Sequence, residues 1–232
     1  MKLYETKKLH YGEYLYKLVI NNRFSNYFRT EFQKDGRLDY ARQRINEMNK
    51  NYNPEKRVLE IRGWATYSIN PYEEVPAEEL WDAIDIYRYL RINKNYKVRC
   101  EMYSLTLYSN DRNMLIKLGN KLRAKYIEFW EPDPSNIETL LTNNNIIIVN
   151  SPPEFEYKIT FGKKMGKPAI ARWILANPTL GKMGSTTIDY CLDSAWVKGL
   201  YFFVKDQRSL MIVQMIIGDN ISRIDKLVYN TE

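Results

Sequence analysis

Hydrophobic and polar positions along the chain follow two periods, which together predict a mixture of strands and helices. An apolar residue at every second position is typical of a strand, and one at every third or fourth position is typical of a helix. Alternation predicts strands at 9–19, 57–69, 104–109, 126–130, 146–149, 155–160, 199–204 and 223–229. The longer spacing predicts helices over 24–32, 38–48, 75–91, 111–118, 168–176 and 206–213. The expected apolar stripes include Phe24, Phe28 and Phe32 on the first helix and Leu80, Ile84 and Tyr87 on the third.

Two of these segments share one plan, in which a strand leads through a polar turn into a helix and then into another strand. An aspartate stands where the N-cap of each helix belongs. The matched pairs are Leu105/Leu200, Leu107/Phe202, Asp111/Asp206, Leu115/Leu210 and Leu118/Val213. The pattern predicts two β-α-β units, and it fits either an internal duplication or the recurrence of a common supersecondary plan.

The element order indicates an α+β fold with mixed or antiparallel sheets. The two β-α-β units make the C-terminal half similar to ferredoxin-like RNA-binding folds, although no RNP motif is present. We expect a basic α+β N-terminal region at 1–95 and a second α+β region at 96–232, with the boundary in the polar stretch 92–95. The alternative is one continuous domain, which 232 residues also allow.

The distribution of charge favours a polyanionic partner. The net charge is +7, with +5 in residues 1–60 and +3 in residues 151–232, while 61–98 and 99–150 carry −1 and 0. A basic surface attracts nucleic acid, although many basic proteins bind none. Frequent Asn, Lys, Ile and Tyr suggest an AT-rich coding genome, and we attach to this composition the hypothesis of a phage or mobile-element origin.

Cysteine, histidine and the N-terminal sequence exclude several classes of function. Cys100 and Cys191 are far apart and have no second ligand at metal-binding spacing, so we expect buried, reduced thiols and no metal or other cofactor. His10, the single histidine, has no serine or cysteine beside it to activate. The start lacks the features of a signal peptide, and no apolar run reaches membrane-spanning length, so we expect a cytoplasmic protein of the producing or host cell that does not bind membranes.

A glycine-containing basic loop is the strongest candidate for anion binding. In the segment 160–168, Lys163, Lys164 and Lys167 accompany two glycines just before a predicted helix. Glycines allow backbone N–H groups to turn toward an anion, and a helix N-terminus adds partial positive charge. Arg172 on that helix and Lys182 in the glycine-bearing loop after it extend the predicted site. The spacing is not that of a Walker A motif, and two solvated turns are the alternative interpretation.

Aromatic and basic residues are also interleaved near the N-terminus. Single-stranded nucleic acid binds by stacking its bases on aromatic rings beside cations that neutralise phosphates. The spacing of the phenylalanines is more typical of a core stripe, which leaves a candidate basic face on other residues. Its members are Arg23, Tyr27, Arg29, Arg42 and Arg44.

A loose nuclease-like pattern is formed by Asp133, Glu156 and Lys158. In PD-(D/E)xK nucleases two carboxylates hold Mg²⁺ and the lysine helps to activate water. The alternative is structural, because Asp133 before Pro134 has the form of a helix N-cap, and Glu156 and Lys158 alternate along a strand.

These observations lead to one preferred function and two alternatives. We expect a non-catalytic nucleic-acid-binding accessory protein that favours single-stranded nucleic acid or RNA. The first alternative is a viral assembly or host-takeover adaptor that binds a protein partner through an exposed tryptophan, and the second is the metal-dependent nuclease. The tryptophans that could form the adaptor surface are Trp64, Trp81, Trp130, Trp173 and Trp196.

Overall fold

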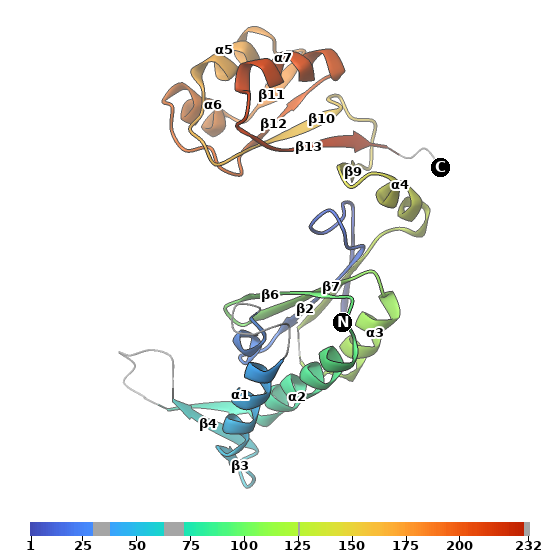
Figure 1. Cartoon of the computed structure of the whole chain (residues 1–232), viewed down its shortest axis with the longest axis vertical. Coiled ribbons are helices and arrows are strands. Elements are labelled where there is room, and N and C mark those ends of the chain that lie inside the picture. The colour runs from blue at the N-terminus through green and yellow to red at the C-terminus, as the bar shows by residue number, and fades with distance from the viewer. Residues whose placement is uncertain (30–37, 63–71, 125, 230–232) are drawn as a thin grey trace. The chain divides into compact units, whose positions relative to one another are not determined.

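A computed structural model describes residues 1–29, 38–62, 72–124 and 126–229 of the chain (Figure 1). The contacts divide it into two units. Unit 1 comprises Met1–Thr6 and Glu13–Asp133, and unit 2 comprises Lys7–Gly12 and Pro134–Glu232. Within the described residues, no helix is both long enough and apolar enough to cross a membrane.

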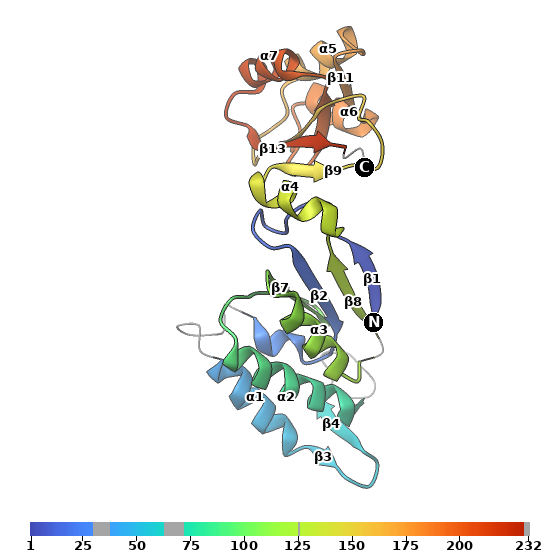
Figure 2. The ribbon, with the colours of Figure 1, turned by 90° about the vertical axis from the view of Figure 1, so that its right-hand side faces the viewer.

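Unit 1 is built on a five-stranded sheet in the order β1-β8-β2-β7-β6. The central strand β2 is antiparallel to both β7 and β8, and β1 joins β8 in parallel at one edge (Figure 2). A smaller antiparallel sheet, β3-β4-β5, belongs to the same unit. The strands of unit 1 are β1 (Lys2–Glu5), β2 (Tyr16–Asn21), β3 (Tyr52–Asn53), β4 (Val58–Arg62), β5 (Tyr72–Pro76), β6 (Lys97–Glu101), β7 (Ser104–Ser109) and β8 (Ile127–Glu131).

Helices cover one face of the larger sheet in unit 1 (Figure 2). Alternate residues of a strand face opposite sides of the sheet. Leu18, Ile20 and Phe129 point toward the helices and are fully buried beneath them. Asp111 caps α3 by accepting a hydrogen bond from the Met114 amide at 2.9 Å, as the sequence predicts. The helices are η1 (Ser25–Phe28), α1 (Asp39–Asn49), α2 (Ala77–Ile92) and α3 (Arg112–Lys121).

Unit 2 contains a second five-stranded sheet, in the order β11-β12-β10-β13-β9. Here β10 is the central strand and is antiparallel to β12 and β13, while β9 joins β13 in parallel. Helices α5 and α7 cover one face (Figure 1), and Ile159, Phe161 and Phe202 are buried in the core beneath them. The elements are α4 (Ile137–Thr142), preceded by η4 (Pro134–Asn136), β9 (Ile146–Ile148), β10 (Tyr157–Phe161), α5 (Pro168–Ala176), β11 (Gly181–Met183), α6 (Ser185–Leu192), β12 (Tyr201–Val204), α7 (Gln207–Ile217) and β13 (Ile221–Val228).

The two large sheets have the same strand arrangement. In unit 1, β2 lies between β7 and β8, which are joined through α3; in unit 2, β10 lies between β12 and β13, which are joined through α7. The outer strands also correspond, since β6 and β11 are antiparallel at one edge and β1 and β9 are parallel at the other. Helix α6 precedes β12, whereas β6 leads directly into β7. Each sheet therefore contains a split β-α-β unit, in which the central strand of the sheet lies between the two strands that the helix connects.

The predicted α+β class with mixed sheets is confirmed, and both predicted β-α-β segments are present. Assignment to the ferredoxin-like fold family stays a prediction. The sequence-based boundary near residue 95 falls inside unit 1, because β2 and β7, which lie on either side of it in the chain, pair in one sheet.

Some local predictions were wrong in detail. Residues 25–28 form a 3₁₀ helix, although Phe24 and Phe28 are buried as expected, and Phe32 lies outside the described residues. The buried stripe of α2 contains Leu80 together with Ala83, Ile86 and Leu90, whereas the predicted Ile84 and Tyr87 are only partly buried. The strand predicted at 9–19 begins at Tyr16, and only 58–62 of the strand predicted at 57–69 is described.

Candidate nucleic-acid interface

The sheet face of unit 2 opposite its helices carries aromatic and basic side chains. Because Phe202 and Val204 point into the core, Tyr201 and Phe203 must point the other way. Lys158 alternates in the same manner with Ile159, and its backbone is directly opposite Phe203 in the ladder between β10 and β12. We call this surface, made of Lys158, Lys182, Tyr201, Phe203 and Arg223, the unit 2 face.

Lys158 and the two aromatic rings form the centre of the unit 2 face. The Lys158 ammonium lies 3.8 Å from the centroid of the Tyr201 ring, in the geometry of a cation–π contact. Tyr201 and Phe203 meet edge to face, with ring centroids 5.5 Å apart. Tyr201 remains 47% exposed. A ring that is held in place yet open to solvent can stack against a planar ligand.

Further cations surround this centre. Lys182 on β11 is exposed and directly opposite Phe203, and Arg223 on β13 is opposite Thr160. Asp225 is 1% exposed on the same side of the sheet, where Lys8 donates to it at 2.9 Å and Arg223 forms an ion pair with it. One carboxylate thus offsets part of the positive charge, and it anchors the segment Lys7–Gly12 to this sheet.

The predicted anion-binding loop lies at the end of β10, and the amides of Gly162, Lys164 and Gly166 have partners within the protein. The Gly162 and Lys164 amides donate to the Asn220 carbonyl and side chain at 2.9 and 3.0 Å. Gly166 donates to the Ala195 carbonyl at 2.8 Å, and a Cβ at Gly166 would meet the Cys191 backbone. A Cβ at Gly162 would lie 3.1 Å from the Asn220 Oδ1, so close packing accounts for both glycines without a bound anion.

The lysines of this loop differ in what they contact. Lys164 forms an ion pair with Asp219, which holds the pKa of that carboxyl below its usual value. The Lys167 ammonium donates to the Ile216 carbonyl at 3.2 Å, and Lys163 is exposed. Arg172 is exposed on α5, a helix that covers the opposite face of the sheet (Figure 1). Among the unit 2 residues predicted to bind nucleic acid, Lys182 is the one that the fold brings beside the aromatic rings.

An exposed tryptophan accompanies the loop. Trp196 is 64% exposed and pairs through an isolated β-bridge with Met165, which is 52% exposed. Three residues further on, the Gly199 amide donates to the Phe161 carbonyl at 3.2 Å, and the chain then enters β12 at Tyr201. The loop, Trp196 and the start of β12 therefore all adjoin the end of β10.

The predicted basic face of unit 1 is held largely by internal contacts. Arg23 lies beside Glu79, with Nη1 and Oε1 3.6 Å apart, and Arg29 donates to Asn26 at 3.1 Å. Arg44 lies 5.5 Å from the Tyr27 ring and pairs with Glu47 at 2.6 Å. Burial raises the pKa of the Tyr27 hydroxyl, with the Arg44 charge acting in the opposite direction. Four of the five predicted residues thus stabilise local structure in unit 1.

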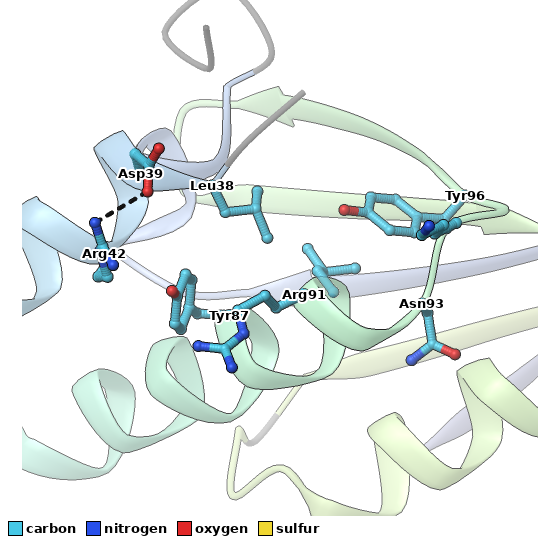
Figure 3. A pocket seen from close by; sticks show the side chains of 9 residues that line it. Leu38, Asp39, Arg42, Tyr87, Arg91, Asn93 and Tyr96 are labelled. Atoms are coloured by element: carbon cyan, nitrogen blue, oxygen red, sulfur yellow. Dashed lines mark ion pairs between the residues drawn. The ribbon is translucent and has the colours of Figure 1, made fainter. Parts of the chain in front are cut away.

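The fifth, Arg42, lines a hollow of about 470 Å³ between α1 and α2 (Figure 3). Arg42 pairs with Asp39 at 3.1 Å, and Arg91 and Lys94 add two further cations to the lining. Figure 3 shows Tyr87 close to Arg42 and Tyr96 at the other end of the hollow. The lining has more positive than negative groups, so the hollow suits a small anion better than a cation.

Two carboxylates on α2 are buried, although nothing in the sequence pattern predicts their burial. Asp82 accepts from the Arg123 amide at 2.9 Å and from the Arg123 guanidinium at 3.1 Å. Asp85 accepts from Lys121 at 2.8 Å and from Arg123 at 3.2 Å. Burial raises the pKa of Asp82 despite these bonds, whereas at Asp85 the effect of burial is outweighed by Lys121 and Arg123, which lower its pKa. The cluster ties α2 to the last residue of α3 and to the chain that follows it.

The nuclease-like residues belong to different units. Asp133 ends unit 1, while Glu156 and Lys158 lie in unit 2, and Lys158 is engaged with the Tyr201 ring. Within the described ranges, no three His, Cys, Asp or Glu side chains group closely enough to hold a metal ion. Asp133 directly precedes the 3₁₀ helix η4, which begins at Pro134 as the structural alternative requires, and Asn136 is the N-cap residue of α4.

The thiols and the histidine occupy ordinary structural positions. Burial raises the pKa of Cys191 to about 11, so this thiol is protonated at neutral pH. Cys100 is only partly buried, on β6, which differs from the expectation of two buried thiols. His10 lies in the segment Lys7–Gly12 of unit 2.

Tyr201, Phe203 and Arg223 were not predicted as site residues from the sequence. A signal was present, because Tyr201, Phe203 and Lys205 alternate with the core residues that were matched to the first β-α-β unit. Strand alternation places such residues on the opposite face, and two aromatics followed by a cation are typical of a nucleic-acid-binding sheet.

The fold and the site together define a class: an α+β protein of two split β-α-β units, one of which has an aromatic and basic sheet face. No protein-family model, curated protein or solved structure matches the chain.

Proposed function

We propose that this protein binds single-stranded nucleic acid, RNA or DNA, through the unit 2 face. The observation that carries the proposal is the Lys158–Tyr201–Phe203 cluster, in which an exposed ring lies beside a cation on the side of the sheet away from the helices. Bases stack on such rings whatever their identity, and lysine neutralises the adjacent phosphate. A duplex would hide its base faces, so this chemistry favours unpaired strands.

The surrounding charge supports the same ligand. Lys182 and Arg223 flank the aromatic pair, and Lys163 at the end of β10 extends the basic surface.

We also propose that both units are ferredoxin-like and that the protein acts in the cytoplasm of the producing or host cell. From composition alone, we propose that it comes from a phage or mobile element.

The test is a titration of a fluorescently labelled 12-nucleotide oligo(U) or oligo(dT), followed by anisotropy at several salt concentrations. Tyr201→Ala should weaken binding by about 1–3 kcal/mol, the range measured when a stacking aromatic is removed. Lys158→Gln should weaken binding and reduce the salt slope by about 0.7, as expected for one lost contact to a single-stranded phosphate.

Lys226→Gln is the matched control, because Lys226 is exposed on the same strand as Arg223 but alternates onto the other face. It should leave affinity and salt slope nearly unchanged. Wild-type protein that binds neither oligonucleotide at low salt, or a Tyr201→Ala variant that is folded and binds as the wild type does, would refute the proposal.

A protein-binding adaptor is the second candidate, favoured by the exposed pair Trp196 and Met165. Tryptophan and methionine are enriched at protein interfaces. Trp196→Ala distinguishes the two candidates. If the tryptophan serves only a protein partner, its removal leaves oligonucleotide binding unchanged, whereas loss of oligonucleotide affinity assigns it to the nucleic-acid site.

A further inference from the structure

The central strands of the two sheets repeat a short sequence as well as a position. β2 begins Tyr16-Lys17-Leu18 and β10 begins Tyr157-Lys158-Ile159. In each unit the third residue of the triplet is fully buried and the lysine alternates onto the opposite face.

The register of the neighbouring strand repeats as well. Lys17 is directly opposite Tyr108 of β7, and Lys158 is directly opposite Phe203 of β12. Tyr108 and Phe203 each follow the core residue matched between the two β-α-β segments, Leu107 and Phe202. Both sheets therefore carry a lysine on the central strand, β2 or β10. Both also carry an aromatic residue opposite that lysine, on the strand that precedes the helix of the β-α-β unit, β7 or β12.

Unit 1 places its lysine over an aromatic ring, as unit 2 does. The Lys17 ammonium lies 3.7 Å from the centroid of Trp130 on β8. Trp130 stacks on Tyr4 of the edge strand β1, with centroids 4.7 Å apart and planes 16° apart. Lys2 adds a second cation 5.1 Å from the centroid of the Tyr4 ring. This face of unit 1 thus presents a row of aromatics with a lysine at either end.

The two faces differ in which neighbouring strand supplies the ring. Lys17 covers a ring on β8, the strand after the helix, whereas Lys158 covers one on β12, the strand before it. Trp130 is enclosed between Lys17 and Tyr4, because β8 lies between β2 and β1. Tyr4 and Trp130 each keep part of their surface exposed to solvent, Tyr4 lies at the sheet edge, and the exposed Lys2 is available to a phosphate.

We propose that unit 1 holds a second binding site for single-stranded nucleic acid, built on Tyr4, Lys17 and Trp130. The inference rests on the proposed function of the unit 2 face and extends it to two sites in each chain. Each site takes a few nucleotides, by stacking and by neutralisation of phosphate.

The experiment is a calorimetric titration with oligo(dT) of 5 nucleotides at low salt. Wild-type protein should bind two molecules per chain. Tyr4→Ala with Lys17→Gln should leave one, and so should Lys158→Gln with Tyr201→Ala, while the four changes combined should leave none. Lys117→Gln, an exposed lysine on α3 at the helix-covered side of unit 1, is the charge-matched control and should retain both sites.

A site-specific readout keeps the inference testable if the unit 1 variant is destabilised. The Trp130 indole N–H resonance, assigned with Trp130→Phe, should shift saturably when the oligonucleotide is added to the wild type and to the Lys158→Gln/Tyr201→Ala variant.

The outcomes separate this inference from the proposed function. One bound oligonucleotide per chain, removed by the unit 2 changes and accompanied by an unmoved Trp130 signal, would overturn the second site and leave the proposed function intact. No binding by wild-type protein would overturn the proposed function and the second site with it.

Discussion

At the scale of single residues, Asp82 and Asp85 show how the contacts of a buried carboxylate determine its effect on stability. Both lie on α2 and both accept from Arg123, but burial raises the pKa of Asp82, whereas Lys121 and Arg123 outweigh burial and lower the pKa of Asp85. A lowered pKa stabilises the fold above the unfolded value near 3.8, and this contribution is lost as pH falls through the folded pKa. A raised pKa has the opposite effect, so the stability contributed by Asp82 falls as pH rises from 3.8 through its folded pKa.

Asp85→Asn should therefore destabilise unit 1 at neutral pH, by about 1–3 kcal/mol, because it removes the charge that Lys121 and Arg123 contact. The difference from the wild type should shrink as pH falls from 3.8, where the unfolded chain takes up a proton, through the lowered pKa of the folded carboxyl, below which both states are neutral. Urea unfolding at pH 7 and pH 3 measures both values. Asp39→Asn, in the exposed pair with Arg42, is the control and should change little. A destabilisation by Asp85→Asn that is equal at the two pH values would contradict the electrostatic explanation.

At the scale of elements, two glycines of unit 2 have different reasons to lack a side chain. A Cβ at Gly166 would lie 2.7 Å from the Cα of Cys191 on α6, and a backbone atom cannot move aside cheaply. A Cβ at Gly181 on β11 would meet the end of the Ile174 side chain, which can adopt another rotamer. The close packing of the 162–167 loop on α6 thus depends on Gly166.

Gly166→Ala should destabilise unit 2 by about 1–3 kcal/mol, the usual cost of overpacking. Gly181→Ala, the matched comparison, should cost less because Ile174 can yield. Denaturant unfolding of the two variants measures the difference. Equal effects would show that α6 moves as readily as a side chain does.

At the scale of the whole molecule, the chain passes between the units more than once, since Lys7–Gly12 belongs to unit 2 while the residues before and after it belong to unit 1. Hydrogen bonds hold this segment to the sheet of unit 2. The Ile148 amide donates to the Lys7 carbonyl at 2.8 Å, and the Lys8 ammonium donates to the buried Asp225 at 2.9 Å. Burial lowers the pKa of Lys8, an effect that Asp225 opposes.

Lys8→Met should destabilise unit 2 by about 1–3 kcal/mol, less than for a fully buried pair because Lys8 is partly exposed and Arg223 continues to contact Asp225. Hydrogen exchange should quicken in β9 and β13. The amides of β2 and β7 in unit 1 should exchange as in the wild type. Faster exchange throughout the chain would show that the two units unfold as one.

Local signals in the sequence determined the class of fold and many of its elements. Asp111 and Asp206 cap α3 and α7 as predicted, and α5 begins at Pro168 and ends before Asn177, because caps and proline act over a few neighbouring residues. Alternation identified the strands of both β-α-β segments, since it needs only one solvated face and one buried face.

The tertiary structure alone decided the strand order, the registers and therefore the candidate site. Lys158 and Tyr201 are 43 positions apart in sequence, and they meet because β10 pairs with β12 in one particular register. Asp225 is buried because a segment from the start of the chain reaches it, and β2 joins β7 across the expected boundary. Such pairings depend on the burial of whole sheet faces, and a one-residue change of register would turn every side chain of a strand to its other face, so no short stretch of sequence specifies them.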